Sequence, residues 1–220
     1  MAMDDGHKYD WKMDHIYYGP GFTNEQIEES LKLCKLDYEY HDDITGVAAE
    51  LIANGKIIGW FQGRMEGGPR ALGNRSILAD PRDPDMKDKL NSQIKHRESW
   101  RPFCPSMLNE DRSEYFDFDH ESPFMILAFD VKEEKRSEIP SVVHVDGTAR
   151  PQTVTKQQNP VYHDLISKFK KITGVPVLIN TSFNIKGEPI VCTPEDAIRC
   201  FYGTGIDSLI LGNFIIKKNK

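Results

Sequence analysis

Residues 160–184 have the sequence PVYHDLISKFKKITGVPVLINTSFN, which predicts a helix followed by a buried strand. The first half places apolar side chains at helical spacing: Tyr162, Leu165, Ile166, Phe169 and Ile172. That spacing is typical of an amphipathic helix over 160–173. The run VPVLIN at 175–180 is continuously apolar, as expected of a strand that is covered on both faces. The polar residues TSFN at 181–184 follow at the carboxyl end of this strand.

The same alternation of helices and strands recurs along the rest of the chain and predicts an α/β protein. Apolar spacing and capping residues indicate further helices after Thr23, at 45–54, at 84–94 and after Thr193. Apolar runs indicate further strands at 56–61, 124–131, 142–145, 209–211 and 214–216. The charged turn KEEKR at 132–136 is expected to leave Arg136 in solvent.

The composition is that of a soluble globular protein, with 39% hydrophobic and 28% charged residues in 220. The net charge of −6 disfavours general nucleic-acid binding, which needs a basic surface to release counterions. No apolar run approaches the roughly 20 residues of a membrane span, and the polar N-terminus resembles neither a signal nor a transit peptide. The four cysteines form no C-x-x-C pair, which predicts reduced thiols, a cytoplasmic location and no metal site.

The arginines are concentrated in one window, because seven of the ten lie between positions 64 and 112, beside glycine-rich turns. A guanidinium group can bond two oxygens of a carboxylate or phosphate at once, so the window predicts an anion site. Gly68 and Gly73 have the spacing of a phosphate-binding P-loop. However, Asn and Arg follow them where Lys and Ser or Thr belong, which excludes that motif.

The loop GPRALGNR at 68–75 therefore has two interpretations. In one, a Gly-Pro turn directly after a strand presents Arg70 as a clamp for an oxyanion. In the other, the loop is a surface turn whose arginines pair with Glu66 or Asp80, since surface ion pairs are common and weak. The residues themselves favour neither interpretation.

The segment KHRESWRPF at 95–103 offers a second group of cations. In an extended backbone, Lys95 and Arg97 would project to the same side, whereas at a helix end they would form a cationic C-terminus. Arg101 stands between a tryptophan and a proline, a setting that often holds a side chain stiffly. His96 is either a general acid or base or, as is commoner for a lone histidine among charges, a bystander.

Two further polar clusters follow predicted strands. The His-x-Asp pair in HVDGTAR at 144–150 lacks a third ligand nearby and predicts no metal, whereas Arg150 is a candidate anion contact. Asn180, Ser182 and Asn184 stand where open α/β sheets bind ligands, although such residues also form simple turns. Together, the four clusters predict one concave anion site.

Five long motifs resemble the C-terminal domain of the O-carbamoyltransferases, a family with nodulation-factor and antibiotic-tailoring members. In chain order within residues 44–220 they are GRMEGGPRALGNRSILADPRD, IKHRESWRPF, HVDGTARPQTV, GVPVLINTSFNIKGEPIVCTPEDA and TGIDSLILGNF. The resemblance implies a YrdC-like fold, a twisted, largely parallel or mixed α/β sheet flanked by helices, with an open cavity. It also implies that the domain uses carbamoyl phosphate and ATP, with Mg²⁺, to make carbamoyl adenylate.

In that family, a separate N-terminal sugar-kinase-like domain holds ferrous iron through a His-x-x-x-His pair and an aspartate, and passes the carbamoyl group to an acceptor hydroxyl. The present sequence contains no His-x-x-x-His. The resemblance therefore implies that this chain lacks its partner domain and is incomplete for the full transfer. We interpret residues 1–43 as an extension or interdomain linker with one helix, and residues 44–220 as the YrdC-like domain.

Matched motif by motif, the resemblance implies catalytic anion contacts at Arg70, Lys95, Arg101 and Arg150. It implies substrate or ATP binding by Arg97, Asn180, Ser182 and Asn184. In the resulting hypothesis, carbamoyl phosphate is held by Arg70, Arg101 and Arg150. The ATP phosphates are held by Lys95, Arg97 and the Ser182 loop.

Two other functions stay open. One is a YrdC-type synthase that makes threonylcarbamoyl adenylate for tRNA modification, which the long family motifs disfavour. The other is an RNA-binding module or a catalytically silent interaction domain. The net charge of −6 speaks against broad nucleic-acid binding, although a local basic cavity can still accept an RNA end.

Overall fold

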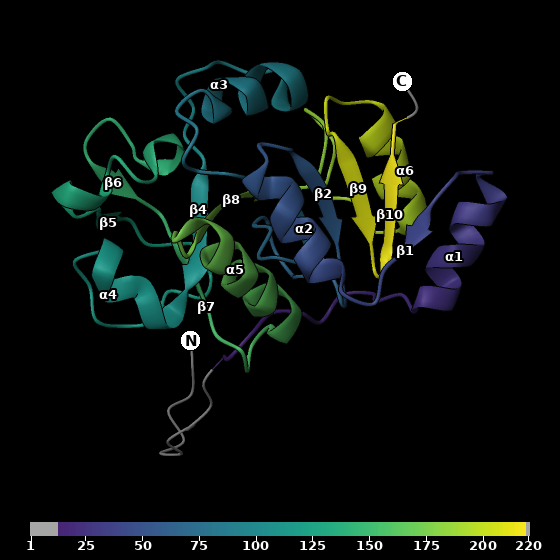
Figure 1. The fold of residues 1–220 in the computed structure, drawn as a ribbon, viewed down its shortest axis with the longest axis horizontal. Helices are drawn as coiled ribbons and strands as arrows, with labels where there is room; N and C mark the ends of the chain where they lie inside the picture. The colour runs from purple at the N-terminus through teal and green to yellow at the C-terminus, as the bar shows by residue number, and fades with distance from the viewer. Residues whose placement is uncertain (1–12, 219–220) are drawn as a thin grey trace, which may run out of the picture.

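A computed structural model describes residues 13–218, which form an eight-stranded sheet with helices packed against it (Figure 1). In spatial order the strands are β1 (Glu39–Tyr40), β10 (Phe214–Lys217), β9 (Ser208–Leu211), β2 (Ile58–Phe61), β3 (Arg75–Ala79), β8 (Val177–Ser182), β4 (Cys104–Leu108) and β7 (Gln152–Val154). Within this sheet, β2–β9 and β4–β7 pair in parallel and the other neighbours pair antiparallel. The predicted mixed α/β sheet flanked by helices is confirmed, with fewer parallel pairs than the resemblance implied.

The helices pack against the sheet mainly through α2, α5 and α6. The described α-helices are α1 (Asn24–Leu33), α2 (Ile44–Ala53), α3 (Met86–Leu90), α4 (Arg112–Tyr115), α5 (Pro160–Thr173) and α6 (Pro194–Tyr202). Figure 1 shows α2 and α5 side by side in front of the sheet, with α6 behind β9. Thr23 and Thr193 form the capping boxes that begin α1 and α6. Among residues 13–218, no helix is long and apolar enough to cross a membrane.

The helix–strand unit predicted at 160–180 is present, with two differences. In α5, Tyr162, Leu165, Ile166 and Phe169 are fully buried. Ile172, in the last turn, is 52% exposed, so it is not buried with the other four residues of the predicted apolar face. Strand β8 extends to Ser182 instead of ending at residue 180, which brings polar residues into the strand itself.

Two strand predictions in the middle of the chain were wrong. Within 124–131, only Phe129–Asp130 forms a strand, β5, and Ile126 is 66% exposed. At 142–145 there is no strand; a 3₁₀ turn (Pro140–Val142) precedes β6 (Thr148–Ala149), which pairs with β5. An Asp-Gly turn at 146–147 lies between the 3₁₀ turn and β6, and the Thr148 N–H stabilises it by donating to the side chain of Asp146. Local apolar runs did not reveal this turn chemistry.

Strands β3, β4 and β7 were missed from the sequence. β3 begins at an arginine and β4 contains a proline, both of which weaken a strand prediction made from propensity alone. All three strands are buried along their whole length between neighbouring elements. Tertiary pairing therefore overrides their unfavourable local composition.

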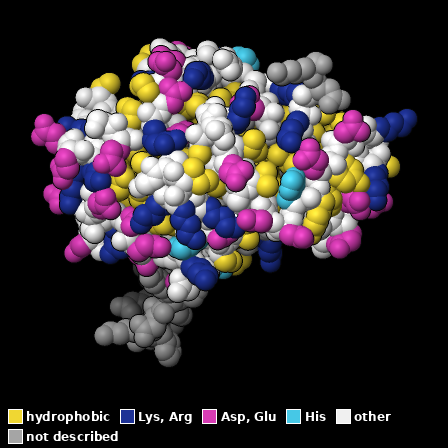
Figure 2. All heavy atoms as spheres, viewed as in Figure 1, with side chains coloured by type: hydrophobic (Ala, Val, Ile, Leu, Met, Phe, Trp, Pro, Cys, Tyr) yellow, Lys and Arg dark blue, Asp and Glu magenta, His cyan; other side chains and the backbone are white. Residues whose placement is uncertain are grey.

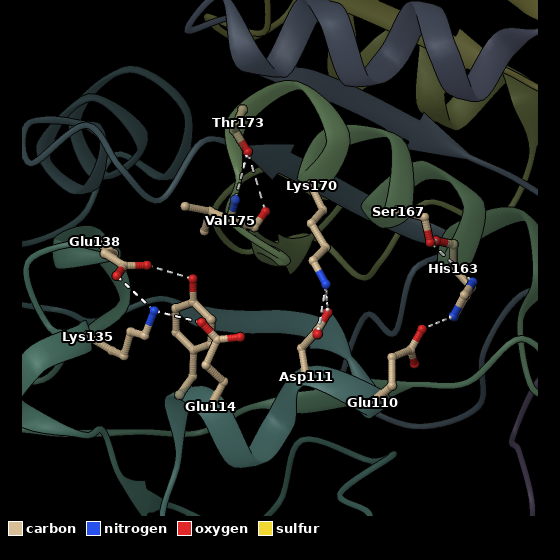
Figure 3. A network of polar contacts seen from close by, with 11 residues as sticks. Glu110, Asp111, Glu114, Lys135, Glu138, His163, Ser167, Lys170, Thr173 and Val175 are labelled. Carbon is tan, nitrogen blue, oxygen red and sulfur yellow. Dashed lines mark hydrogen bonds and ion pairs between the residues drawn. The ribbon is translucent and has the colours of Figure 1, made fainter.

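Residues 109–150, from the 3₁₀ turn (Asn109–Asp111) before α4 through β6 to Arg150, form an arm at one end of the sheet, beyond β4 and β7 (Figure 1). Figure 3 shows the polar network that ties the arm to α5. Lys170 binds Asp111 at 2.8 Å, and His163 lies 2.9 Å from Glu110. Each such pair near the surface contributes at most about 1 kcal/mol, so the network positions the arm more than it stabilises the fold.

A second network holds the arm together internally. Lys135 forms ion pairs with Glu114 at 2.7 Å and with Glu138 at 2.9 Å (Figure 3). Arg136, which we expected in solvent, is only partly exposed, and its Nε donates to the carbonyl of Val131. The arm bears on the candidate site because Arg150 directly follows β6.

Gly73 permits close packing between α5 and the loop at 68–75, here called the arginine loop. Its φ is +102°, and an added Cβ would lie 2.2 Å from Cδ1 of Tyr162, a fully buried side chain. We expect Gly73→Ala to lower the free energy of unfolding by about 2 kcal/mol or more, because backbone strain and a steric clash add together.

Gly55→Ala is the matched control for this prediction. Gly55 also has a positive φ, +75°, but nothing lies within 4 Å of an added Cβ. Urea unfolding of the two variants should show a cost of only about 1 kcal/mol for Gly55→Ala. Equal losses would show that the contact with Tyr162 is not what constrains Gly73.

Candidate functional site

The loop between β2 and β3 is organised by the buried carboxylate of Glu66, which is 2% exposed. Its Oε1 accepts hydrogen bonds from the backbone N–H groups of Leu72 at 2.6 Å, Asn74 at 3.2 Å and Arg75 at 3.2 Å. Glu66 therefore orders the backbone and forms no ion pair with Arg70. The surface-turn interpretation is wrong for Glu66, and the guanidinium group of Arg70 has no hydrogen bond or ion pair among residues 13–218.

Arg75 supports the loop from below and is completely buried. Its guanidinium group donates to the carbonyls of Gln62 at 2.7 Å, Asn74 at 3.0 Å and Pro20 at 3.1 Å. It also stacks 3.6 Å from the centre of the Phe61 ring. Burial lowers the pKa of Arg75 to about 10, which leaves it charged at neutral pH. With all these carbonyl partners, Arg75 holds the loop and is not exposed to an anion.

Arg82 is a structural arginine of another kind. Its Nη2 lies 2.6 Å from Oδ2 of Asp80, a carboxylate that is almost completely buried. The predicted surface pairing of a loop arginine with Asp80 is thus also wrong, because the partner of Asp80 is Arg82, which lies outside the 68–75 loop. The seven arginines of the window therefore divide into structural and exposed groups, a division that only their contacts reveal.

Residues 16–20 pack along the same loop. Backbone hydrogen bonds join Gly19 to Met65 at 2.9 Å and Gly67 to Ile16 at 2.7 Å, and Arg64 donates to the carbonyl of Tyr18. This part of the segment that we interpreted as a linker is therefore ordered against the arginine loop.

Two adjoining cavities contain all eight residues that the sequence singled out. The first, of about 140 Å³, is here called the arginine cavity; among its lining residues are Arg70, Arg97, Arg150, Asn180, Thr181 and Ser182. The second, of about 230 Å³, is called the lysine cavity; its lining includes Lys95, Arg97, Arg101, Ser182, Asn184 and Lys186. Arg97 and Ser182 line both, so the two cavities share a wall.

The two cavities are strongly positive. No carboxylate is among the residues that line the arginine cavity, and Glu98 is the acidic residue that lines the lysine cavity. Figure 2 shows a different charge pattern on the face that carries α2 and α5, where acidic and basic side chains are interspersed. The positive charge is therefore gathered in the cavities while the whole chain stays acidic.

Lys95 ends a π-helical turn (Asn91–Lys95) that continues α3, and the next residue, His96, has a left-handed backbone with φ of 44°. The Nζ of Lys95 donates to the carbonyl of Ser182 at 2.5 Å and to Oδ1 of Asn184 at 2.8 Å. Lys95 thus ties the end of β8 to the wall of the lysine cavity. Because burial, reinforced by the charge of Arg97, opposes protonation, the pKa of Lys95 falls to about 7.

Arg97 lies between the two cavities and is held from two sides. Its Nε donates to Oδ1 of Asn91 at 2.7 Å, and its guanidinium group lies 4.7 Å from the centre of the Phe103 ring. Burial and the nearby charge of Arg101 lower the pKa of Arg97. Arg101 is more exposed and forms an ion pair with Glu98 at 3.1 Å. Arg101 therefore lies beside Lys95, and not with Arg70 and Arg150 as our hypothesis grouped it.

Arg150 enters the arginine cavity from the end of the arm. Its Nη2 lies 3.0 Å from Sγ of Cys104, and its Nε is buried without a partner among the described residues. Cys104 and Met125 also line this cavity. The arm thus contributes both Arg150 and Met125 to a cavity whose other wall is the arginine loop.

The histidines near the predicted site contribute no metal centre. His96 is exposed, and it is not among the residues that line either cavity. His144 Nδ1 lies 3.2 Å from the hydroxyl of Thr148, and burial lowers its pKa. Among residues 13–218, no group of three or more His, Cys, Asp or Glu side chains could hold a metal ion.

Three cavity residues were missed by the sequence reasoning: Cys104, Met125 and Lys186. Cys104 directly follows the quoted motif ending in RPF, and Lys186 lies two residues beyond Asn184 inside another motif. Their positions within the motifs were an available signal for both. Met125 has no such signal, because it belongs to the run that was predicted to be a buried strand.

The comparisons with known proteins agree with this architecture. Full-length HypF, solved in a phosphate- and nucleotide-bound form, superposes with a TM-score of 0.52 at 16% identity and covers 82% of this chain and 22% of its own. P. abyssi Sua5 complexed with L-threonine gives a TM-score of 0.54 at 16% identity, over 77% of this chain and 46% of that chain. These likenesses confirm the YrdC-like fold.

Sequence relatives are much closer. Nodulation protein NolO of Bradyrhizobium diazoefficiens is 50% identical over 214 residues, which cover 94% of this chain and 39% of the relative. The 3'-hydroxymethylcephem-O-carbamoyltransferase of Streptomyces clavuligerus is 41% identical over 204 residues, 93% of this chain and 37% of the relative. The chain thus spans well under half the length of these relatives.

A family model described as carbamoyltransferase C-terminus matches residues 49–218. That match includes both cavities and covers most of the chain. The protein therefore belongs to the carbamoyltransferase C-terminus family.

Proposed function

We propose that this chain binds carbamoyl phosphate and ATP in its two adjoining cavities and forms carbamoyl adenylate. The observation that carries the proposal is the set Arg70, Arg97 and Arg150, three guanidinium groups around one cavity without a lining carboxylate. Fixed cations of this kind suit a ligand with several negative charges. Because Arg97 and Ser182 line both cavities, an anion bound in the lysine cavity would lie directly beside one bound in the arginine cavity.

The reaction needs such a site because both partners are anions. Two like charges about 4 Å apart repel by roughly 4 kcal/mol at an effective dielectric constant near 20, and ATP carries several charges. Carbamoyl phosphate loses phosphate to water, and an oxygen of the resulting carbamate attacks the α-phosphorus of ATP, so that pyrophosphate leaves. The protein's contribution is positioning and neutralisation, which requires no protein nucleophile.

The geometry supports a revised division of labour. Arg70 and Arg150 bind the phosphate of carbamoyl phosphate in the arginine cavity. Lys95, Arg101 and the Ser182 loop bind the ATP phosphates in the lysine cavity, where Lys186 adds a further charge. Arg97, on the shared wall, faces the point where the carbamate oxygen meets the α-phosphate. ATP enters as its Mg²⁺ complex, in which phosphate oxygens supply ligands to the metal.

The wider setting is also a proposal. Transfer of the carbamoyl group to an acceptor hydroxyl is assigned to an N-terminal sugar-kinase-like domain with ferrous iron, which corresponds to the part of the relatives that this chain does not cover. We place the reaction in the cytoplasm, where ATP is available. The four cysteines are free thiols, in keeping with that location.

Calorimetry of the 220-residue chain tests the proposal directly. We expect ATP–Mg²⁺ and carbamoyl phosphate each to bind at submillimolar to millimolar concentration, and the two together to release pyrophosphate. Threonine with bicarbonate in place of carbamoyl phosphate is the control for the synthase alternative. The proposal is wrong if neither ligand binds at millimolar concentration, or if pyrophosphate appears only with threonine and bicarbonate.

Arg150→Ala should weaken the binding of carbamoyl phosphate by roughly 10- to 100-fold, because it removes a charged hydrogen-bond donor from the arginine cavity. The affinity for ATP–Mg²⁺ should change much less. Arg199→Ala is the matched control, since Arg199 lies on α6 with its side chain 64% exposed. Unchanged affinity in Arg150→Ala, measured by calorimetry, would remove this residue from the site.

The lowered pKa of Lys95 predicts a pH dependence. Below its pKa of about 7 the side chain is charged, and above it the side chain is neutral in the free protein. A bound polyphosphate favours the charged form, so binding takes up a proton above pH 7. We expect the affinity for ATP–Mg²⁺ to fall as the pH rises from about 7 to 9, by at most tenfold per unit.

Proton uptake can be measured by calorimetry in two buffers that differ in ionisation enthalpy. Lys95→Gln should abolish the uptake and flatten the pH profile, even where it also weakens binding by loosening the Ser182 loop. A wild-type affinity that is constant from about pH 7 to 9 would contradict a role for the Lys95 charge.

A further inference from the structure

A relay of buried amides beneath the arginine cavity begins at the carbonyl of Leu72. A backbone carbonyl can only accept hydrogen bonds, so the group 2.8 Å from it must be the donor Nε2 of Gln152. The other branch of the same amide, Oε1, then accepts from the hydroxyl of Ser106 at 2.7 Å and from Nδ2 of Asn180 at 3.2 Å. The orientation of Gln152 is thereby determined.

Asn180 is oriented by the same logic. Its Nδ2 also donates to the carbonyl of Ala71 at 3.1 Å, a second group that can only accept. Reversing the amide would place Oδ1 against this carbonyl and against Oε1 of Gln152, and would lose both hydrogen bonds. The donor branch of Asn180 is therefore fully used, and the acceptor branch, Oδ1, faces away from it.

This Oδ1 atom has no hydrogen-bond partner among the described residues, although Asn180 is only 1% exposed. Buried polar atoms without a partner are rare, because they lose their interaction with water and gain nothing in return. Asn180 lines the arginine cavity together with its neighbours on β8, Thr181 and Ser182. An unpaired acceptor thus belongs to a residue that lines a cavity otherwise rich in donors.

An ionised phosphate cannot satisfy this oxygen, because phosphate oxygens only accept hydrogen bonds from the protein. A ligand that satisfies this oxygen needs a hydrogen-bond donor, and in a cavity lined by three arginines its other end is anionic. Carbamoyl phosphate has one such group, the planar –NH₂ attached to its carbonyl carbon. The cations and the amide oxygen therefore match the two ends of a single small molecule.

We propose that Oδ1 of Asn180 accepts a hydrogen bond from the –NH₂ of the carbamoyl group and so selects carbamoyl phosphate over acyl phosphates that lack an N–H donor. This inference rests on the proposed function, since it names how that ligand is recognised. Gln152 acts as a positioning residue, because it turns the Asn180 amide so that oxygen and not nitrogen is available. Recognition of the phosphate stays with Arg70 and Arg150.

Acetyl phosphate tests the inference, because it replaces –NH₂ by a methyl group of similar size. Calorimetry of the wild-type chain should show acetyl phosphate binding at least about 10-fold more weakly than carbamoyl phosphate, since the methyl group leaves Oδ1 unpaired. In Asn180→Ala this ratio should fall to about 1. Arg150→Ala is the control, because it should weaken both ligands by a similar factor and leave the ratio unchanged.

The outcomes separate the two proposals. If carbamoyl phosphate binds but acetyl phosphate binds equally well to the wild-type chain, the role of Asn180 is refuted while the proposed function stands. A ratio that survives in Asn180→Ala has the same meaning. If neither acyl phosphate binds, the proposed function and the inference both fail. The wild-type comparison decides the matter alone if Asn180→Ala does not fold.

Discussion

A buried carboxylate, that of Glu66, sets the shape of the loop between β2 and β3, and the candidate site depends on that shape. Three backbone N–H groups of the loop point inward and would be unsatisfied without an acceptor, which Glu66 supplies. Arg75 satisfies the carbonyls on the same loop. Both charges are used inside the loop, whereas the side chain of Arg70 has no hydrogen bond or ion pair within residues 13–218. Hydrogen bonds to the backbone offset part of the cost of burying one acid and one base, since Oε2 of Glu66 and Nε of Arg75 are buried without a partner among the described residues.

Strand β8 links this loop to the rest of the site. It lies between β3 and β4, so the residues at its polar end face the arginine loop on one side and the arm on the other. Asn180 reaches the buried amide relay, while Ser182 reaches Lys95. A small shift of β8 would alter both cavities together. This coupling suits a reaction in which two anions must meet along one line.

The site gathers positive charge around two adjoining cavities, which suits the proposed reaction between two anionic ligands. Two of the cations are restrained: Arg97 by Asn91 and Phe103, and Lys95 by the end of β8. Restrained cations lose little conformational entropy when an anion binds. Lys95 differs from the arginines because its burial brings its pKa close to neutrality, so its charge can respond to what binds beside it.

The sequence alone determined the α/β class, the helix–strand unit at 160–180 and eight of the residues that line the cavities. These follow from apolar spacing and from motifs long enough to be specific. Only the tertiary structure showed that Arg70 and Arg75 have different roles and that Arg101 lines the same cavity as Lys95. It also showed that Oδ1 of Asn180 is a buried acceptor without a partner among the described residues. The physical reason is that a side chain's role depends on its partners. Those partners can be far apart in sequence, as are Asn180 and Ala71 at 109 residues, and they are brought together by strand pairing that local composition does not reveal.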